Sequence, residues 1–228
     1  MKVVEVLKRL GCARAVVVCH KSQITVVLAA HSIANILSSE GEHADLVELS
    51  PIHHDTLERV LELRGVKWRG RIVQSFNEVS PEGPIVVHAV GMDPTTFYSE
   101  LQRLRLRVRV VFSHAAKKLG LVLKAPVIRI VELPRELYRA SMTLGGSATI
   151  RVMLDGVREV VSDKKLDFLA MARSILLDSM AEYGPITVKD ATNILSATLN
   201  VRKEEARKIL YDLLEFKMVK IKNGYVHL

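Results

Sequence analysis

The sequence has 228 residues, of which 49% are hydrophobic and 25% are charged, and its formal net charge is +8. This length suits one large domain or two small ones, and the hydrophobic content is ample for a core. No apolar run approaches the roughly 18–20 residues that a membrane-spanning helix needs, and the amino terminus lacks the apolar segment of a signal peptide. We therefore expect a soluble, cytoplasmic protein without membrane contact, whose Cys12 and Cys19 are buried free thiols.

The amino-terminal two thirds of the chain alternate between strand and helix patterns. A helix is predicted over 1–10, and the β-branched run Val16–Val18 predicts a buried strand. Apolar residues then recur at helical spacing from Ile24 to Leu37, with Ser22 placed to cap that helix. Further strands are predicted over 44–49, 71–76, 85–90, 107–112 and 127–131, with helices over 55–64 and from Asp93 onward. This alternation predicts an α/β fold with a mostly parallel, doubly wound, Rossmann-like sheet over residues 1–140.

The pattern changes after Pro134. Residues 143–147 read as a flexible link and 148–161 as a hairpin, so that 141–162 form a linker. Helices are predicted over 166–183, 188–199 and 203–216, the last one capped by Asn200. Two short strands, 218–222 and 225–228, follow around an Asn-Gly turn, which is a strong hairpin signal. This order predicts a winged-helix domain over 163–228.

Polar side chains follow several of the predicted strands. Ligands of open α/β sheets bind outside the carboxyl ends of the strands. The residues at those ends form a candidate pocket, vestigial or ligand-binding, made of His20, Lys21, Ser22, Thr25, His88, Gly91, Ser113 and His114.

The positive charge is concentrated in the middle of the chain, where residues 103–162 carry 12 basic and 4 acidic side chains. This surplus is a candidate footprint for a phosphate backbone, and a surface of the hyperthermophile type is the alternative. In an extended conformation, alternate residues of 103–110 would form a basic stripe opposite an apolar one. The candidate nucleic-acid-binding residues are Arg103, Arg105, Arg107, Arg109, Arg202, Lys203, Arg207, Lys208 and Lys222. Glu204, Glu205 and Asp212 share the last helix, which keeps a protein-binding role open.

Two segments resemble the DHH phosphoesterase superfamily, which includes the RecJ nucleases. The turn His20-Lys21-Ser22-Gln23-Ile24-Thr25 stands where that family has His-Lys-Asp-x-Asp-Gly, and the order of elements over 85–121 follows the family. The resemblance implies two metal ions held by aspartates, but Ser22, Ile24, His88 and Ser113 stand at those positions. It therefore implies a pseudoenzyme without catalytic residues, metal or cofactor. A single zinc on the three histidines is an alternative to hydrogen-bonded residues of an emptied pocket.

Two functions remain open on this basis. The first is a non-catalytic, inactive RecJ-like scaffold of archaeal DNA replication or repair, with DNA and the GINS and MCM complexes as partners. The second is a ligand-sensing winged-helix transcription regulator with a CRISPR-associated type of Rossmann-like sensor domain, for which we expect a homodimer. An active metal-dependent phosphoesterase is disfavoured by the missing carboxylates.

Overall fold

The computed structural model describes residues 2–41, 43–116, 118–133, 136–142, 145–160 and 164–227. The chain divides into two compact units. The first comprises residues 1–130 with 140–160, and the second comprises residues 131–139 with 161–228. None of the helices in these described ranges is both long and apolar enough to cross a membrane.

A nine-stranded sheet runs through the α/β part of the chain in the order β3-β2-β4-β5-β1-β6-β7-β8-β9. All pairings resolved from β3 to β6 are parallel, whereas β8 and β9 form an antiparallel hairpin. All five residues of β1 are buried, as expected for a central strand covered on both faces. The strands are β1 (Ala15–Cys19), β2 (Asp45–Glu48), β3 (Ile72–Val73), β4 (Ile85–Ala89), β5 (Val108–Ser113), β6 (Val127–Leu133), β7 (Leu137–Met142), β8 (Gly146–Met153) and β9 (Gly156–Glu159).

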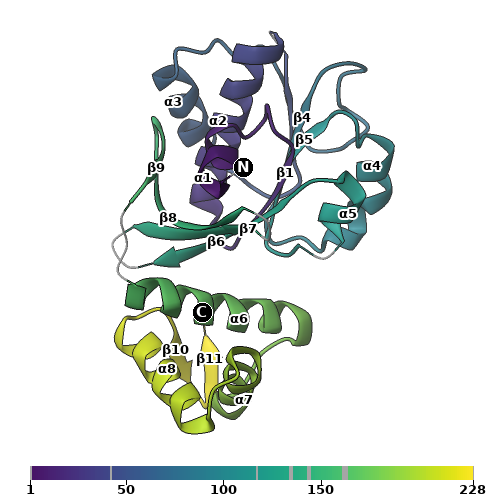
Figure 1. Cartoon of the computed structure of the whole chain (residues 1–228). Coiled ribbons are helices and arrows are strands. Elements are labelled where there is room, and N and C mark those ends of the chain that lie inside the picture. Colours follow the sequence, from purple (N-terminus) through teal and green to yellow (C-terminus); the bar gives the residue numbers. More distant parts are fainter. Residues whose placement is uncertain are drawn as a thin grey trace. The chain divides into compact units, whose positions relative to one another are not determined.

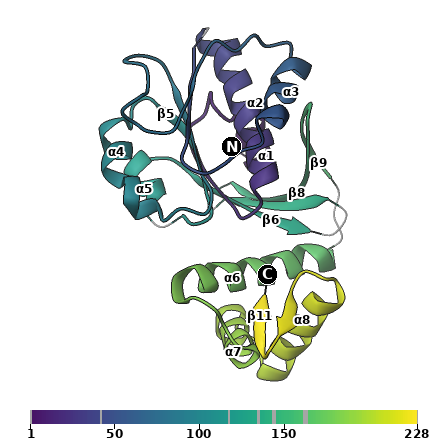
Figure 2. The same ribbon diagram turned by 180° about the vertical axis from the view of Figure 1, so that it is seen from behind.

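Helices cover both faces of this sheet, which gives the first unit three layers (Figures 1 and 2). One face carries α1 (Val3–Lys8), α2 (Ser22–Glu40) and α3 (His54–Leu63). The other carries a 3-10 turn (Pro94–Phe97), α4 (Tyr98–Arg103) and α5 (Leu119–Leu123). The expectation of an α/β fold with a large, mostly parallel central sheet is thereby confirmed.

Several details differ from the sequence prediction. Strand β7 and helix α5 were not predicted, and the hairpin β8–β9 continues the central sheet. Thr143 and Leu144, part of the predicted link, lie outside the described residues. Asn200 ends α7 in the left-handed conformation, at φ 53°, and does not cap the helix that follows. Both cysteines are free, but only Cys19 is buried.

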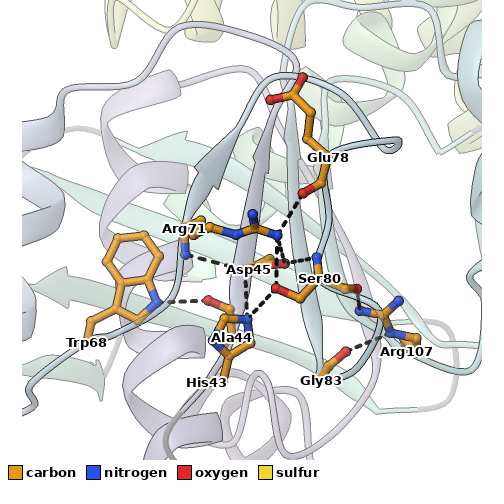
Figure 3. A network of polar contacts seen from close by, with 9 residues as sticks. All are labelled: His43, Ala44, Asp45, Trp68, Arg71, Glu78, Ser80, Gly83 and Arg107. Carbon is orange, nitrogen blue, oxygen red and sulfur yellow. Dashed lines mark hydrogen bonds and ion pairs between the residues drawn. The ribbon is translucent and has the colours of Figure 1, made fainter.

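A buried carboxylate organises the amino-terminal edge of the sheet (Figure 3). Asp45, the first residue of β2, is 1% exposed. Its oxygens accept the backbone N–H of Ser80 at 2.6 Å and of Arg71 at 3.3 Å, and His43 Nε2 lies 2.9 Å away. Burial alone would raise the pKa of Asp45, but the hydrogen bonds from Ser80 and Arg71, with the charge of His43, outweigh burial and lower it.

The chain beside this carboxylate is packed against the backbone of β2. Trp68 Nε1 donates to the carbonyl of Ala44 at 2.8 Å. Gly70 lies against the same carbonyl so closely that a Cβ built on it would overlap the Ala44 oxygen and Trp68 Nε1. Only glycine therefore fits here, although its φ is not in the left-handed region.

The second unit consists of three helices and a two-stranded hairpin. They are α6 (Lys164–Tyr183), α7 (Val188–Leu199), α8 (Lys203–Glu215), β10 (Lys220–Lys222) and β11 (Tyr225–His227) (Figure 1). Thr187, just before α7, forms an antiparallel bridge with Tyr225. The core of this unit is made of Leu169, Leu176, Ala191, Leu195, Ala206, Ile209, Leu213 and Val226, among others.

Residues 131–139 belong to this second unit because they share its core and its polar contacts. Leu133 is part of the buried cluster, against which Leu137 packs. Arg173 of α6 donates to the carbonyl of Glu132 at 2.9 Å, and Arg139 pairs with Asp167 at 2.7 Å.

Candidate functional site

The topology of the sheet places a switch point between β1 and β5. The connection from β1 leads through α2 to β2 on one side, whereas the connection from β5 leads through α5 to β6 on the other side. Such a point is where open α/β sheets bind ligands. His20 follows β1 and His114 follows β5, and their rings stand edge to face with centroids 6.1 Å apart. The structure thus brings these two predicted pocket residues together.

His88 of β4 is fully buried and bound on both sides of its ring. Its Nε2 lies 2.9 Å from Thr25 Oγ1, and its Nδ1 lies 2.9 Å from Ser50 Oγ. Because the Thr25 hydroxyl donates to the carbonyl of Ser22 at 2.7 Å, it accepts the proton of His88 Nε2. His88 Nδ1 also lies 3.2 Å from the Ser50 carbonyl, so both the hydroxyl and the backbone oxygen of Ser50 contact this nitrogen. His88 therefore joins β4 to α2 and to the segment after β2.

Burial lowers the pKa of His88 below its ordinary value, against smaller opposing effects of its hydrogen bond with Ser50 and of the charge of Glu48. The unfolded chain takes up a proton near the ordinary histidine pKa of 6.5, whereas the folded chain does so only at lower pH. The contribution of His88 to stability is therefore complete above pH 6.5 and declines as the pH falls below it.

We expect His88→Leu to lower the free energy of unfolding by about 1–3 kcal/mol near pH 8, because Thr25 and Ser50 lose a buried partner. The variant should also lose less stability than the wild type between about pH 7 and pH 5. Urea unfolding at both pH values measures this difference. Burial also lowers the pKa of His31, but His31 is present in both proteins, so its effect on the pH dependence cancels in the comparison. Equal pH dependence of the two proteins would refute this role of His88.

The other predicted pocket residues lie at a helix start, in a turn or at a strand end, where they serve the local backbone structure. Lys21 is the exposed N-cap of α2, so Ser22 lies within the helix and does not cap it. Gly91 turns the chain after β4 with φ 91°. Ser113 is buried, and its Oγ accepts the N–H of Ala115 at 3.3 Å. No three histidine, cysteine or acidic side chains in the described part of the chain are grouped to hold a metal ion, so the zinc alternative has no geometric support.

The arginines of 103–109 do not form the predicted stripe, because the chain becomes extended only at Val108. Arg103 ends α4 and pairs with Glu100 at 2.6 Å. Arg107 donates to the carbonyls of Gly83 at 2.8 Å and Ser80 at 2.6 Å, which commits it to the fold. Arg105 is exposed, and Arg109 is half-buried in β5.

A groove of about 460 Å³ lies within the second unit, between α7, α8 and β10. Its described lining includes the cationic residues Lys189, Lys203 and Arg207 and no acidic residue. The other lining residues are Val188, Thr192, Asn193, Leu210, Tyr211, Leu214 and Ile221. Two of the predicted nucleic-acid-binding residues, Lys203 and Arg207, are thus brought to one site. Arg202, Lys208 and Lys222 are exposed but do not line this groove.

Sequence reasoning missed the contribution of α7 and of the exposed aromatic ring. Lys203, Arg207 and Tyr211 recur every four residues and therefore share one face of α8. Lys189 and Asn193 have the same spacing on α7. These spacings are visible in the sequence, whereas the packing that makes the two faces line one groove is not.

Neither a family model nor a curated protein matches this chain. Several solved structures do match it, at low sequence identity. A RadB recombinase is matched at 16% identity and a TM-score of 0.49, over 67% of this chain and 92% of that one. A KaiC-like protein from the hyperthermophilic archaeon Pyrococcus horikoshii OT3 is matched at 11% identity and a TM-score of 0.42, over 67% of this chain and 91% of that one.

These two matches contradict the predicted resemblance to DHH phosphoesterases. The succession of strand, polar turn and helix that suggested it is common to parallel α/β sheets, and the aspartates that would have distinguished a DHH site are absent from the sequence. The matches also contradict the functions predicted from the sequence. These were an inactive RecJ-like scaffold with GINS and MCM as partners and, as the alternative, a transcription regulator. The prediction that the chain is not an enzyme followed from an emptied DHH site, so it is corrected together with that resemblance; one of the matched structures is a recombinase.

Proposed function

We propose that this protein binds DNA through a winged-helix domain formed by residues 163–228. In this proposal the DNA contacts α8 and the hairpin β10–β11, which stand in the order of elements where a winged helix has its third helix and its wing. Three features support it: the order of three helices and a hairpin, the bridge between Thr187 and Tyr225, and the hydrogen bond from Val188 N–H to the Gly224 carbonyl at 3.1 Å. The last two join the start of α7 to the hairpin.

The groove between α7, α8 and β10 is the observation that carries the proposal. Lys189, Lys203 and Arg207 come from two helices and converge on its lining without an acidic side chain among the described lining residues. Cations that converge in this way attract a polyanion, because phosphates neutralised by Lys and Arg release their condensed counterions.

The hairpin after α8 is also positively charged. Residues 217–227 contain Lys217, Lys220 and Lys222 and no acidic residue. All three lysines are exposed, and Lys222 lies at the turn of the hairpin. These lysines do not line the groove, whose hairpin residue is Ile221, so they add positive charge to the hairpin outside the groove.

The proposal predicts salt-dependent DNA binding that depends on the groove cations. In a double variant, Lys203→Ala with Arg207→Ala, the slope of log affinity against log salt should fall by about 1 for each contact removed. Affinity at low salt should fall by roughly tenfold or more. Fluorescence anisotropy of a labelled oligonucleotide, titrated with the full chain between about 50 and 200 mM salt, measures both.

Lys208→Ala is the matched control, because Lys208 is an exposed cation of the same helix that does not line the groove. Its effect on affinity should be small. An equal loss in the control and the double variant would reject the groove as the interface. A wild-type chain that binds no DNA at low salt would reject the proposed function itself.

A further inference from the structure

The lining of the groove is more apolar than a phosphate backbone alone requires. Tyr211 is 70% exposed, and Ile221, from β10, is 40% exposed, although both are large and apolar. Leu210 and Leu214 extend the apolar lining along α8. Side chains of this kind are normally covered, and here they line a hollow whose cations come from the same helix faces.

The spacing of residues along α8 places the ring of Tyr211 in line with two cations of the groove. Lys203, Arg207 and Tyr211 are separated by four residues each, so they follow one another along one face of α8. A backbone that runs along Lys203 and Arg207 would bring its next base to Tyr211. Successive phosphates and an aromatic platform are the combination that binds single strands, because every base has a face that can stack on the ring.

A duplex would leave these apolar lining residues without a partner. Its bases are stacked inside, so it presents phosphates and groove edges but no free base face. The volume of about 460 Å³ lies in the range of cavities that hold small organic molecules, about 300–1,000 Å³, which is the scale of a nucleotide rather than of a double helix.

The first turn of α8 also opposes entry into a duplex. Recognition helices of this class contact base edges with their amino-terminal residues. Here that turn exposes Glu204 and Glu205, and the carboxylate of Glu205 accepts the N–H of Arg202 at 3.2 Å. Two carboxylates in the major groove would face phosphates of the same sign.

We propose that the groove between α7, α8 and β10 binds single-stranded DNA, with Lys203 and Arg207 on phosphates and Tyr211 stacked on an unpaired base. This inference rests on the proposed DNA binding and specifies the form of DNA that the site accepts.

The test compares labelled (dT)12 with a 12-base-pair duplex of mixed sequence, each titrated with the full chain at low salt. We expect the single strand to bind more tightly. Tyr211→Ala should weaken binding of (dT)12 by about 5- to 150-fold, whereas Tyr211→Phe, which keeps the ring, should bind within about twofold of the wild type. Tyr183→Ala is the matched control, because Tyr183 is 74% exposed and does not line the groove.

The outcomes distinguish failure of the single-strand assignment from failure of DNA binding itself. Tighter binding of the duplex, or loss of (dT)12 binding in Tyr211→Phe as well as in Tyr211→Ala, would overturn the single-strand assignment and leave DNA binding in place. Unchanged (dT)12 affinity in Tyr211→Ala would do the same. Absence of binding to both probes would overturn both proposals. Because Tyr211 is mostly exposed, the variants should keep the wild-type thermal unfolding temperature, which is measured alongside.

Discussion

Replacement of Gly70 by alanine is expected to lower the free energy of unfolding by about 3 kcal/mol or more. The added Cβ would overlap the carbonyl oxygen of Ala44, which is backbone and cannot rotate away. Relief of the overlap would move the segment of Trp68 away from β2 and break the hydrogen bond from Trp68 Nε1 to Ala44. Urea denaturation followed by circular dichroism measures the loss.

Gly65→Ala separates this overlap from the backbone preference of glycine. Gly65 has φ 66°, where alanine is strained, but no atom lies within 4 Å of the place that a Cβ would occupy. Its replacement should cost only about 1–2 kcal/mol. If the Gly70 variant were as stable as the Gly65 variant, the close approach of Gly70 to Ala44 would not add to the free-energy cost of the substitution.

Asp45→Asn is expected to cost about 3 kcal/mol near neutral pH. The amide keeps the shape of the carboxylate, but it removes the charge and turns hydrogen atoms toward the N–H groups of Ser80 or Arg71. Because the pKa of Asp45 is lower in the folded chain than the ordinary aspartate value of 3.8, the stabilisation is present above pH 3.8 and is lost as the pH falls through the folded-state pKa.

The stability difference between wild type and Asp45→Asn should therefore narrow at acid pH, and urea unfolding at about pH 7 and pH 3 measures it. Asp55→Asn serves as the control, since Asp55 is an exposed carboxylate in the first turn of α3. It should cost less than about 1 kcal/mol. A loss in Asp45→Asn no larger than that of the control would mean that the buried carboxylate contributes nothing specific.

The fold could be predicted where the apolar pattern was strong. The buried runs that became β1 and β4 were located to within two residues, and α7 was predicted with its observed bounds, 188–199. Strand β7 was missed because its residues are only partly buried except for Ala140, so the apolar alternation is weak. Helix α5 was missed because five residues carry too little periodicity to detect.

The sites were harder to predict, because they depend on contacts between distant segments. The position of His20 and His114 follows from a general rule about strand ends. The pairing of His88 with Ser50 does not, since it depends on how the loop after β2 returns to the sheet. The family assignment failed for a related reason: an order of elements common to many sheets cannot replace the acidic residues that would identify the chemistry.

The polar network at the amino-terminal edge has a consequence for how the chain opens locally. Between α3 and β4 the chain makes a long excursion, whose only regular strand among the described residues is the two-residue β3. Its return is fastened at Ser80, which contacts Asp45, Arg71 and Arg107. Arg71 also binds the carbonyl of Glu78. Asp45, Ser80, Arg71 and Arg107 thus form one connected network, so we expect loss of the Asp45 carboxylate to loosen the start and the end of this segment together.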